Sequence, residues 1–265
     1  MLLLAATAGS VISLVGGVYL LYGKKGARTL QRFAVPFAAG ALLAAAFLDL
    51  LPEALEHGEA MQTLTYALVG LVLFFVLERS LSWFHHHHDD GKTTHVAGRR
   101  TVSLIVIGDT VHNFIDGMAI GASFLVDPAI GFVTTLAIAA HEIPQEIGDF
   151  GLMLSKGMKK SKVLTVNLVS AVATIVGAVI VFGFGSELGI SESLLLAVTA
   201  GFFIYIAASD IIPTIHAEPK RKSANLQTLV LILGIVIVGL AAHSAHQLIP
   251  HGEEHADTAE YEHRH

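Results

Sequence analysis

The sequence predicts an all-α integral membrane protein with eight transmembrane helices. Of the 265 residues, 53% are hydrophobic and only 14% are charged, and the mean hydropathy is +0.65. Soluble domains carry about 25% charged residues, so this composition excludes an ordinary soluble class. Eight apolar segments are each long enough for the ~20 residues that cross a hydrocarbon core. The basic residues fall between these segments in an alternating pattern, which supports the same class.

The eight segments follow one another with short connections. The first lacks a preceding basic residue and is followed by Lys24, Lys25 and Arg28, which favours a retained helix over a signal peptide. We expect one transmembrane domain over residues 1–250, a cytoplasmic loop at 85–100 and an outer tail at 251–265. The segments lie near residues 2–22, 33–56, 63–84, 101–126, 129–155, 163–185, 192–217 and 225–249.

The distribution of basic residues predicts the orientation of the chain. Of the 16 Lys and Arg residues, all except Arg264 follow the first, third, fifth or seventh segment. The alternate connections carry acidic residues and no Lys or Arg. Because basic residues favour the cytoplasmic side, both termini should face away from the cytoplasm. We expect the cell membrane, plasma or inner, as the location.

Ionisable residues lie in the middle of the fourth and fifth segments, in the runs 112–117 and 141–149. A charged group at the bilayer centre costs about 2.5 kcal/mol or more, so such residues usually mark a pathway or a bound ion. Residues four apart share one face of a helix. A lone buried His or Asp is explained by a hydrogen bond between helices, but a cluster of carboxylates would repel itself. A bound cation resolves this conflict for His112, Asp116, His141, Glu142 and Glu146.

Two short motifs suggest an inverted repeat. Asp49-x-x-Pro52 in the second segment resembles Asp210-x-x-Pro213 in the seventh, and the predicted topology runs these segments in opposite directions. Segments one to three and six to eight would then form an inverted pair around the central segments four and five, as in many transporters. Chance recurrence of Asp-x-x-Pro is the alternative. Candidate pathway residues are Asp49, Glu53, Asp109, Asp149 and Asp210.

These motifs resemble the ZIP family of metal transporters. His-Asn-x-x-Asp-Gly in the fourth segment, His-Glu-x-Pro-x-Glu in the fifth and eight segments with both ends outside are similar to that family, and the resemblance covers essentially the whole chain. The resemblance implies influx of divalent metal, usually zinc, into the cytoplasm, with Fe²⁺, Mn²⁺ and Cd²⁺ as other candidate substrates. It implies the metal ligands His112, Asn113, Asp116, His141, Glu142 and Gln145.

One residue departs from the family pattern. Gln145 stands where the related subgroup often has a second His, and an amide oxygen is a poorer zinc ligand than imidazole. The same Gln145 breaks the His-Glu-x-x-His set that an intramembrane zinc protease needs. A cation-efflux carrier also uses a His-x-x-x-Asp pair, but that class has six spans and a cytoplasmic domain. We therefore expect no enzymatic activity and no catalytic cofactor.

Histidines outside the central segments form a second group. The run His85, His86, His87 and His88 in the predicted cytoplasmic loop is a candidate for metal capture, with a solvated linker as the alternative. The His- and Glu-containing tail, 251–265, either gathers metal or is a disordered acidic end. As partners we expect the divalent ion, the lipid bilayer and, for assembly, a homodimer, but no nucleic acid.

Overall fold

The computed structural model describes residues 1–22, 27–86, 94–155, 157–187 and 189–248, which are helical almost throughout and include no strand. The all-α class is therefore confirmed for the described residues. Each of the eight predicted segments coincides with one helix or with a continuous run of helices. The elements are α1 (Leu2–Tyr22), α2 (Ala27–Ala45), η1 (Ala46–Leu50), α3 (Leu51–Glu56), α4 (Ala60–His86), α5 (Thr94–Val126), α6 (Pro128–Ser155), α7 (Lys160–Phe184), α8 (Glu192–Tyr205), η2 (Ile206–Ile211), α9 (Ile212–His216) and α10 (Arg221–Leu248).

Five helical stretches of the described residues are long and apolar enough to cross a membrane by length and composition. They are Arg32–Glu56, Ala60–Ser80, Lys160–Phe184, Glu192–Ser209 and Arg221–Gln247. α6, which has 28 residues and carries Glu142 and Glu146, is not among them.

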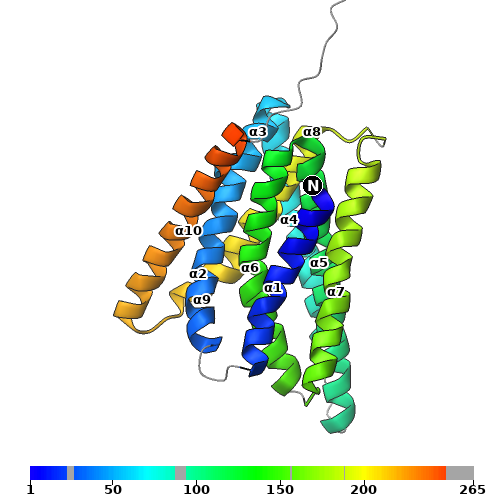
Figure 1. Ribbon diagram of the computed structural model, residues 1–265, viewed down its shortest axis with the longest axis vertical. Coiled ribbons are helices and arrows are strands. Elements are labelled where there is room, and N and C mark those ends of the chain that lie inside the picture. Colours follow the sequence, from blue (N-terminus) through cyan, green and yellow to red (C-terminus); the bar gives the residue numbers. More distant parts are fainter. Residues whose placement is uncertain (23–26, 87–93, 156, 188, 249–265) are drawn as a thin grey trace, which may run out of the picture.

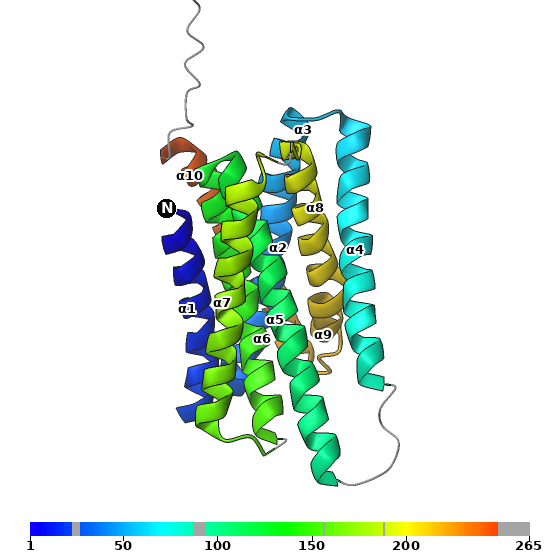
Figure 2. The ribbon, with the colours of Figure 1, turned by 90° about the vertical axis from the view of Figure 1, so that its right-hand side faces the viewer.

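The helices pack as two groups that lie side by side (Figures 1 and 2). In one group, α5 packs along α7, and α1 packs along α6 and α7. In the other, α2 packs along α10 and α4 packs along α8. α5 and α6 also contact each other, and α2 contacts α6 across the boundary between the groups. Large apolar side chains such as Leu68, Val169 and Leu240 remain exposed on the outside, which suits a surface facing lipid.

Reciprocal glycines bring two of these helix pairs into close contact. A Cβ added at Gly40 of α2 would lie 2.1 Å from the Leu231 carbonyl oxygen, and one at Gly234 of α10 would lie 2.4 Å from that of Phe37. Gly70 of α4 and Gly201 of α8 face each other's helices in the same way. Membrane helices approach this closely only where residues are small, so these glycines fix the pairs α2–α10 and α4–α8.

Both Asp-x-x-Pro motifs contain a π-helical turn. The Leu51 N–H bonds to the Ala46 carbonyl and the Ile212 N–H to the Ala207 carbonyl, which is five residues back in each case. The next residue is Pro52 or Pro213, which has no N–H and therefore cannot continue the α-helical pattern. The sequence predicted a shared motif here but not the widened turn.

Candidate metal site

The position of α5 depends on its close contact with α7. A Cβ at Gly117 would lie 1.9 Å from the Thr174 carbonyl oxygen, and one at Gly177 would lie 2.3 Å from that of Phe114. Gly121 meets α7 one turn further on, so α5 presents a Gly-x-x-x-Gly face to α7. The face of α5 that carries His112 is thereby directed toward α6.

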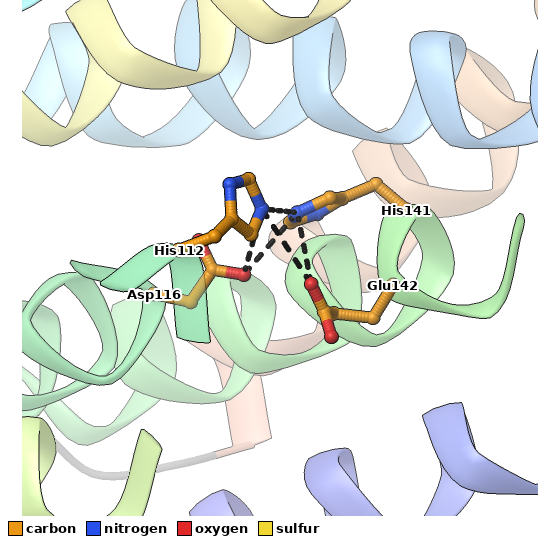
Figure 3. A group of neighbouring side chains, drawn as sticks. All are labelled: His112, Asp116, His141 and Glu142. Carbon is orange, nitrogen blue, oxygen red and sulfur yellow. Dashed lines mark hydrogen bonds and ion pairs between the residues drawn. The ribbon is translucent and has the colours of Figure 1, made fainter. Parts of the chain in front are cut away.

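Four side chains from α5 and α6 converge at this interface. Figure 3 shows His112 and Asp116 of α5 pointing toward His141 and Glu142 of α6. The His112 and His141 Nε2 atoms are 3.2 Å apart, and His141 Nε2 is 3.2 Å from Asp116 Oδ2. Glu142 Oε1 is 3.5 Å from His112 Nε2 and 3.7 Å from His141 Nε2. We call these four residues the central cluster.

The spacing of these atoms suits a tetrahedral metal ion. All four candidate ligand atoms lie within 4.8 Å of one another, and five of their separations are 3.2–3.7 Å. Zinc bound to N and O ligands at about 2.0–2.1 Å in a tetrahedron separates them by about 3.3–3.4 Å. The central cluster therefore matches the ligand spacing of zinc closely, with two imidazoles and two carboxylates.

Burial leaves the carboxylates of the central cluster in need of a cation. Asp116 and Glu142 are 2% and 4% exposed, and His141 is 2% exposed. Asp116 Oδ2 and both Glu142 oxygens accept no hydrogen bond from the described residues. A buried carboxylate oxygen without a hydrogen bond is costly, and neutral imidazoles 3.2–3.7 Å away do not balance its charge, whereas a divalent ion between these groups would neutralise both carboxylates.

Phe74 of α4 covers the central cluster from the opposite helix group. Its ring meets the His112 ring edge to face, with centroids 5.7 Å apart and an interplanar angle of 88°. Phe202 and Tyr205 of α8 pack on Phe74 with centroid distances of 5.4 and 5.6 Å. Sequence reasoning missed this aromatic wall, because nothing in the spacing of single aromatic residues relates α4 to α5.

Asn113 is directed away from the central cluster, toward α7. Its Nδ2 donates to Asp109 Oδ1 at 3.1 Å and to Ser170 Oγ at 3.3 Å, while its Oδ1 accepts from Thr174 Oγ1 at 2.9 Å. The amide is thus engaged at both ends in the gap between α5 and α7. In this arrangement Asn113 joins two helices, and its part as a metal ligand stays a prediction.

The remaining candidate ligands lie further along α6. Gln145 is half-buried, one turn beyond His141. Glu146 is 1% exposed, and its Oε2 accepts no hydrogen bond from the described residues. Asp109 and Asp149 are the neighbouring carboxylates whose charges act on Glu146. α5 and α6 are antiparallel, so these acidic residues continue from the central cluster toward one end of the bundle.

Two of the candidate pathway residues lie toward the other end, near α3. Asp49 of η1 contacts His246 of α10, with Oδ1 and Nε2 2.8 Å apart. Glu53 lies beside His57, whose Nε2 is 3.1 Å from Glu192 Oε2. The pKa of His57 is raised, mainly by its ring bond to the Glu53 carbonyl and then by the charge of Glu192.

Several predicted residues fall outside the part of the chain that the structure describes. His87, His88 and the tail 251–265 lie outside it, and only the backbone of His85, His86 and Asp210 is described. The structure therefore leaves the loop and tail interpretations as they stood.

The fold and the central cluster together describe a helical protein with helices of membrane-spanning length and a buried group of His and carboxylate side chains that could hold a metal ion. Comparison with known proteins gives the family. The chain matches the ZIP zinc transporter family over residues 1–103 and 84–242, and it belongs to that family.

Individual relatives are similar over different lengths. Zinc transporter ZIP13 of Pongo abelii is 33% identical over 236 residues, which cover 83% of this chain and 69% of that protein. Zinc transporter foi of Drosophila melanogaster is 40% identical over 140 residues, or 52% of this chain and 20% of that protein. Zinc transporter SLC39A7 of Homo sapiens is 35% identical over 147 residues, or 53% and 31%. The chain thus spans from a fifth to about two thirds of these relatives.

Proposed function

We propose that this protein carries divalent transition-metal ions, zinc foremost, across a membrane into the cytoplasm, and that His112, Asp116, His141 and Glu142 hold the ion in transit. The observation that carries the proposal is the convergence of two imidazoles and two carboxylates at 3.2–3.7 Å inside a helical bundle. Membership of the ZIP zinc transporter family supports the substrate class.

The proposed chemistry follows from the ligand types. Imidazole suits zinc, copper, iron and nickel, whereas carboxylate oxygen also suits harder ions. A mixed set of two His and two carboxylates therefore favours zinc without excluding Fe²⁺, Mn²⁺ or Cd²⁺. The imidazoles must be neutral and the carboxylates ionised when they bind the metal. Protons therefore compete with the metal, and acid should weaken its binding.

The proposed direction of transport rests on charge. Arg32, Lys160 and Arg221 lie near helix ends at one side of the bundle, opposite the end that carries α3 and the start of α1 (Figure 1). Basic residues favour the cytoplasmic face. The α3 end is then the outer end, and Asp109, Glu146 and Asp149 extend from the central cluster toward the cytoplasm. All eight helical segments would cross the bilayer in this arrangement.

An inverted repeat is also part of the proposal. The motif Gly-x8-Asp-x2-Pro occurs as Gly40, Asp49 and Pro52 and again as Gly201, Asp210 and Pro213. Each copy contains a π-helical turn, and each glycine packs against another helix of its group, α10 or α4. The match of spacing, backbone and packing supports an internal repeat over chance recurrence. Homodimer formation remains a prediction.

Metal uptake into sealed vesicles tests the function. The purified protein is reconstituted, and zinc, manganese and iron are offered outside while a metal indicator reports inside. We expect saturable zinc uptake that His141→Ala abolishes. His216→Ala is the control, because this exposed residue ends α9 away from the cluster. Equal zinc uptake by the parent protein and the His141→Ala variant would reject the central cluster as the transport site.

A further inference from the structure

A second His–carboxylate contact lies inside the bundle, outside the central cluster. Asp49 of η1 and His246 of α10 are 197 residues apart in sequence, yet Asp49 Oδ1 and His246 Nε2 are 2.8 Å apart. We call these two residues the outer pair. The close packing of Gly40 and Gly234 brings α2 and α10 together and so holds the two side chains at this distance.

The Asp49 carboxylate has binding capacity that the His246 contact does not use. Its side chain is 0% exposed, and its second oxygen, Oδ2, is buried and accepts no hydrogen bond from the described residues. A simple hydrogen bond between helices would not require a carboxylate, since an Asn could accept the same bond. An ionisable residue inside a membrane protein marks a functional site by default.

The charges around the outer pair are negative. Glu53 and Asp127 are the neighbouring carboxylates whose charges act on Asp49. No Lys or Arg follows the second, fourth, sixth or eighth segment up to residue 263, so no basic residue at this end compensates them. A protonated His246 gives one positive charge against the three carboxylates Asp49, Glu53 and Asp127, which leaves two negative charges in excess. A divalent cation would be attracted to this position.

The backbone at Asp49 also differs from a regular helix. Asp49 lies in the π-helical turn Ala46–Leu50, and π-helical turns often occur at functional sites. The turn follows from Pro52, so the sequence builds the irregular backbone and the buried carboxylate together. His246 is 29% exposed, which leaves one side of the pair open to an approaching ion.

We propose that Asp49 and His246 form a second binding site for a divalent transition metal, through which the ion passes between the outer surface and the central cluster. This inference rests on the proposed function and deepens it. Among the described residues we assign two ligands to this site, Asp49 and His246, so that water would take the other coordination positions. The outer pair therefore binds the ion weakly and releases it to the central cluster, whose four ligands replace more of the ion's bound water.

Zinc binding to a protein with a disabled central cluster tests the proposal. The double variant His141→Ala and Glu142→Ala, purified in detergent, should retain one weak zinc site. Adding Asp49→Asn should remove that site, although Asn can still accept a hydrogen bond from His246. Adding His246→Ala should also remove it, whereas His243→Ala should not, because His243 bonds to Gln247 one turn away.

Transport by the single variants gives a second readout. In vesicles, Asp49→Asn and His246→Ala should raise KM for zinc about tenfold, a typical loss for one metal-site contact, and change kcat little. His243→Ala should leave both unchanged. Size-exclusion profiles identical to that of the parent protein establish that the variants fold.

The two proposals fail in different ways. Zinc transport by the double variant would overturn the central site, whatever the outer pair does. Loss of all zinc binding in the double variant, or residual binding that survives Asp49→Asn, would overturn the outer site alone. An unchanged KM in both single variants would reduce the outer pair to a contact between α2 and α10.

Discussion

The central cluster and the outer pair contain the same kinds of side chain, imidazoles and carboxylates, in different numbers. The first brings two imidazoles and two carboxylates from two neighbouring helices within 4.8 Å. The second brings one imidazole and one carboxylate from η1 and α10 to 2.8 Å. Both contain buried carboxylate oxygens that accept no hydrogen bond from the described residues. The number of candidate ligands, rather than their type, distinguishes the two positions.

This difference indicates how a transporter can bind an ion with different affinities at successive positions. A site with four ligands can replace most of the water around zinc, whereas a site with two cannot. The two positions also belong to different helix groups, because α5 and α6 carry the first and α2 and α10 the second. Variants can therefore perturb one position while leaving the other intact, and the following predictions use that separation.

The largest effect is expected from Asp116→Asn. The Asp116 carboxylate lies 3.2 Å from His141 Nε2 and 3.7 Å from His112 Nε2, and Asn would remove its charge at nearly the same volume. We expect the rate of zinc uptake to fall at least a hundredfold. For Asp49→Asn we expect the smaller effect described above, a KM about tenfold higher. Initial uptake rates over a range of zinc concentrations measure both. A milder defect in Asp116→Asn than in Asp49→Asn would reverse the proposed order of the two sites.

The next largest effect is expected from Gly117→Ala, with Gly108→Ala for comparison. Gly117→Ala places a methyl group 1.9 Å from the Thr174 carbonyl oxygen, so α5 must move from α7 and carry His112 and Asp116 with it. We expect a melting temperature several degrees lower and weak zinc binding at the central cluster. Gly108→Ala in the same helix is the control, because a Cβ there meets nothing within 4 Å. Since Ala favours helix by up to about 1 kcal/mol over Gly, Gly108→Ala should be neutral or stabilising.

Gly40→Ala is the corresponding test of the outer pair. A Cβ at Gly40 would lie 2.1 Å from the Leu231 carbonyl oxygen, so α2 must move from α10 and draw Asp49 away from His246. We expect a raised KM for zinc with an intact central cluster, measured by uptake and by zinc binding to the purified variant. Loss of zinc from the central cluster in Gly40→Ala would show that the two helix groups are not independent.

Gln145→His should have a smaller effect and change selectivity. The residue lies one turn beyond His141, and a second imidazole at this position would favour zinc over manganese. We expect the ratio of zinc to manganese uptake to rise several-fold, while turnover slows because a tighter site releases its ion less readily. Competition uptake with both metals measures this ratio. An unchanged ratio would place Gln145 outside the site.

The smallest effect is expected at His57, which lies beside Glu53 near α3. Its pKa is raised by its bond to the Glu53 carbonyl and by the charge of Glu192, so the folded protein favours the protonated form. This contribution to stability is present below the ordinary His pKa of about 6.5 and is lost as pH rises through the raised value. His57→Ala should therefore lower the melting temperature at pH 5.5 and leave it unchanged at pH 8.5. Equal losses at both pH values would contradict the ionic account.

Much of the fold could be predicted because apolar length and charge placement are local properties. The eight predicted segments coincide with the helical runs, and the stripes containing His112, Asp116, His141 and Glu142 follow from helical spacing alone. The π-helical turns were not predicted. A proline indicates that a helix is disturbed, but several backbone responses are open to it, and the surrounding packing selects one.

Which helix each polar face contacts was harder to predict. Asn113 directly follows His112 in the sequence, yet its amide forms hydrogen bonds with α7, because Gly117 and Gly177 bring that helix close. The contact of Asp49 with His246 joins residues 197 apart, and no local pattern reveals such a pairing. The metal ligands themselves remain predictions, which the variants above address.

The π-helical turn at Ala46–Leu50 changes which side chains share a helix face before and after it. A turn closed five residues back contains one residue more than an α-helical turn, so the faces before and after it are out of phase by about 100°. A single helical wheel drawn over α2 and α3 would therefore assign Glu53 to the wrong face. Deleting one residue within the turn would return the two halves to a common phase and rotate every side chain that follows Asp49.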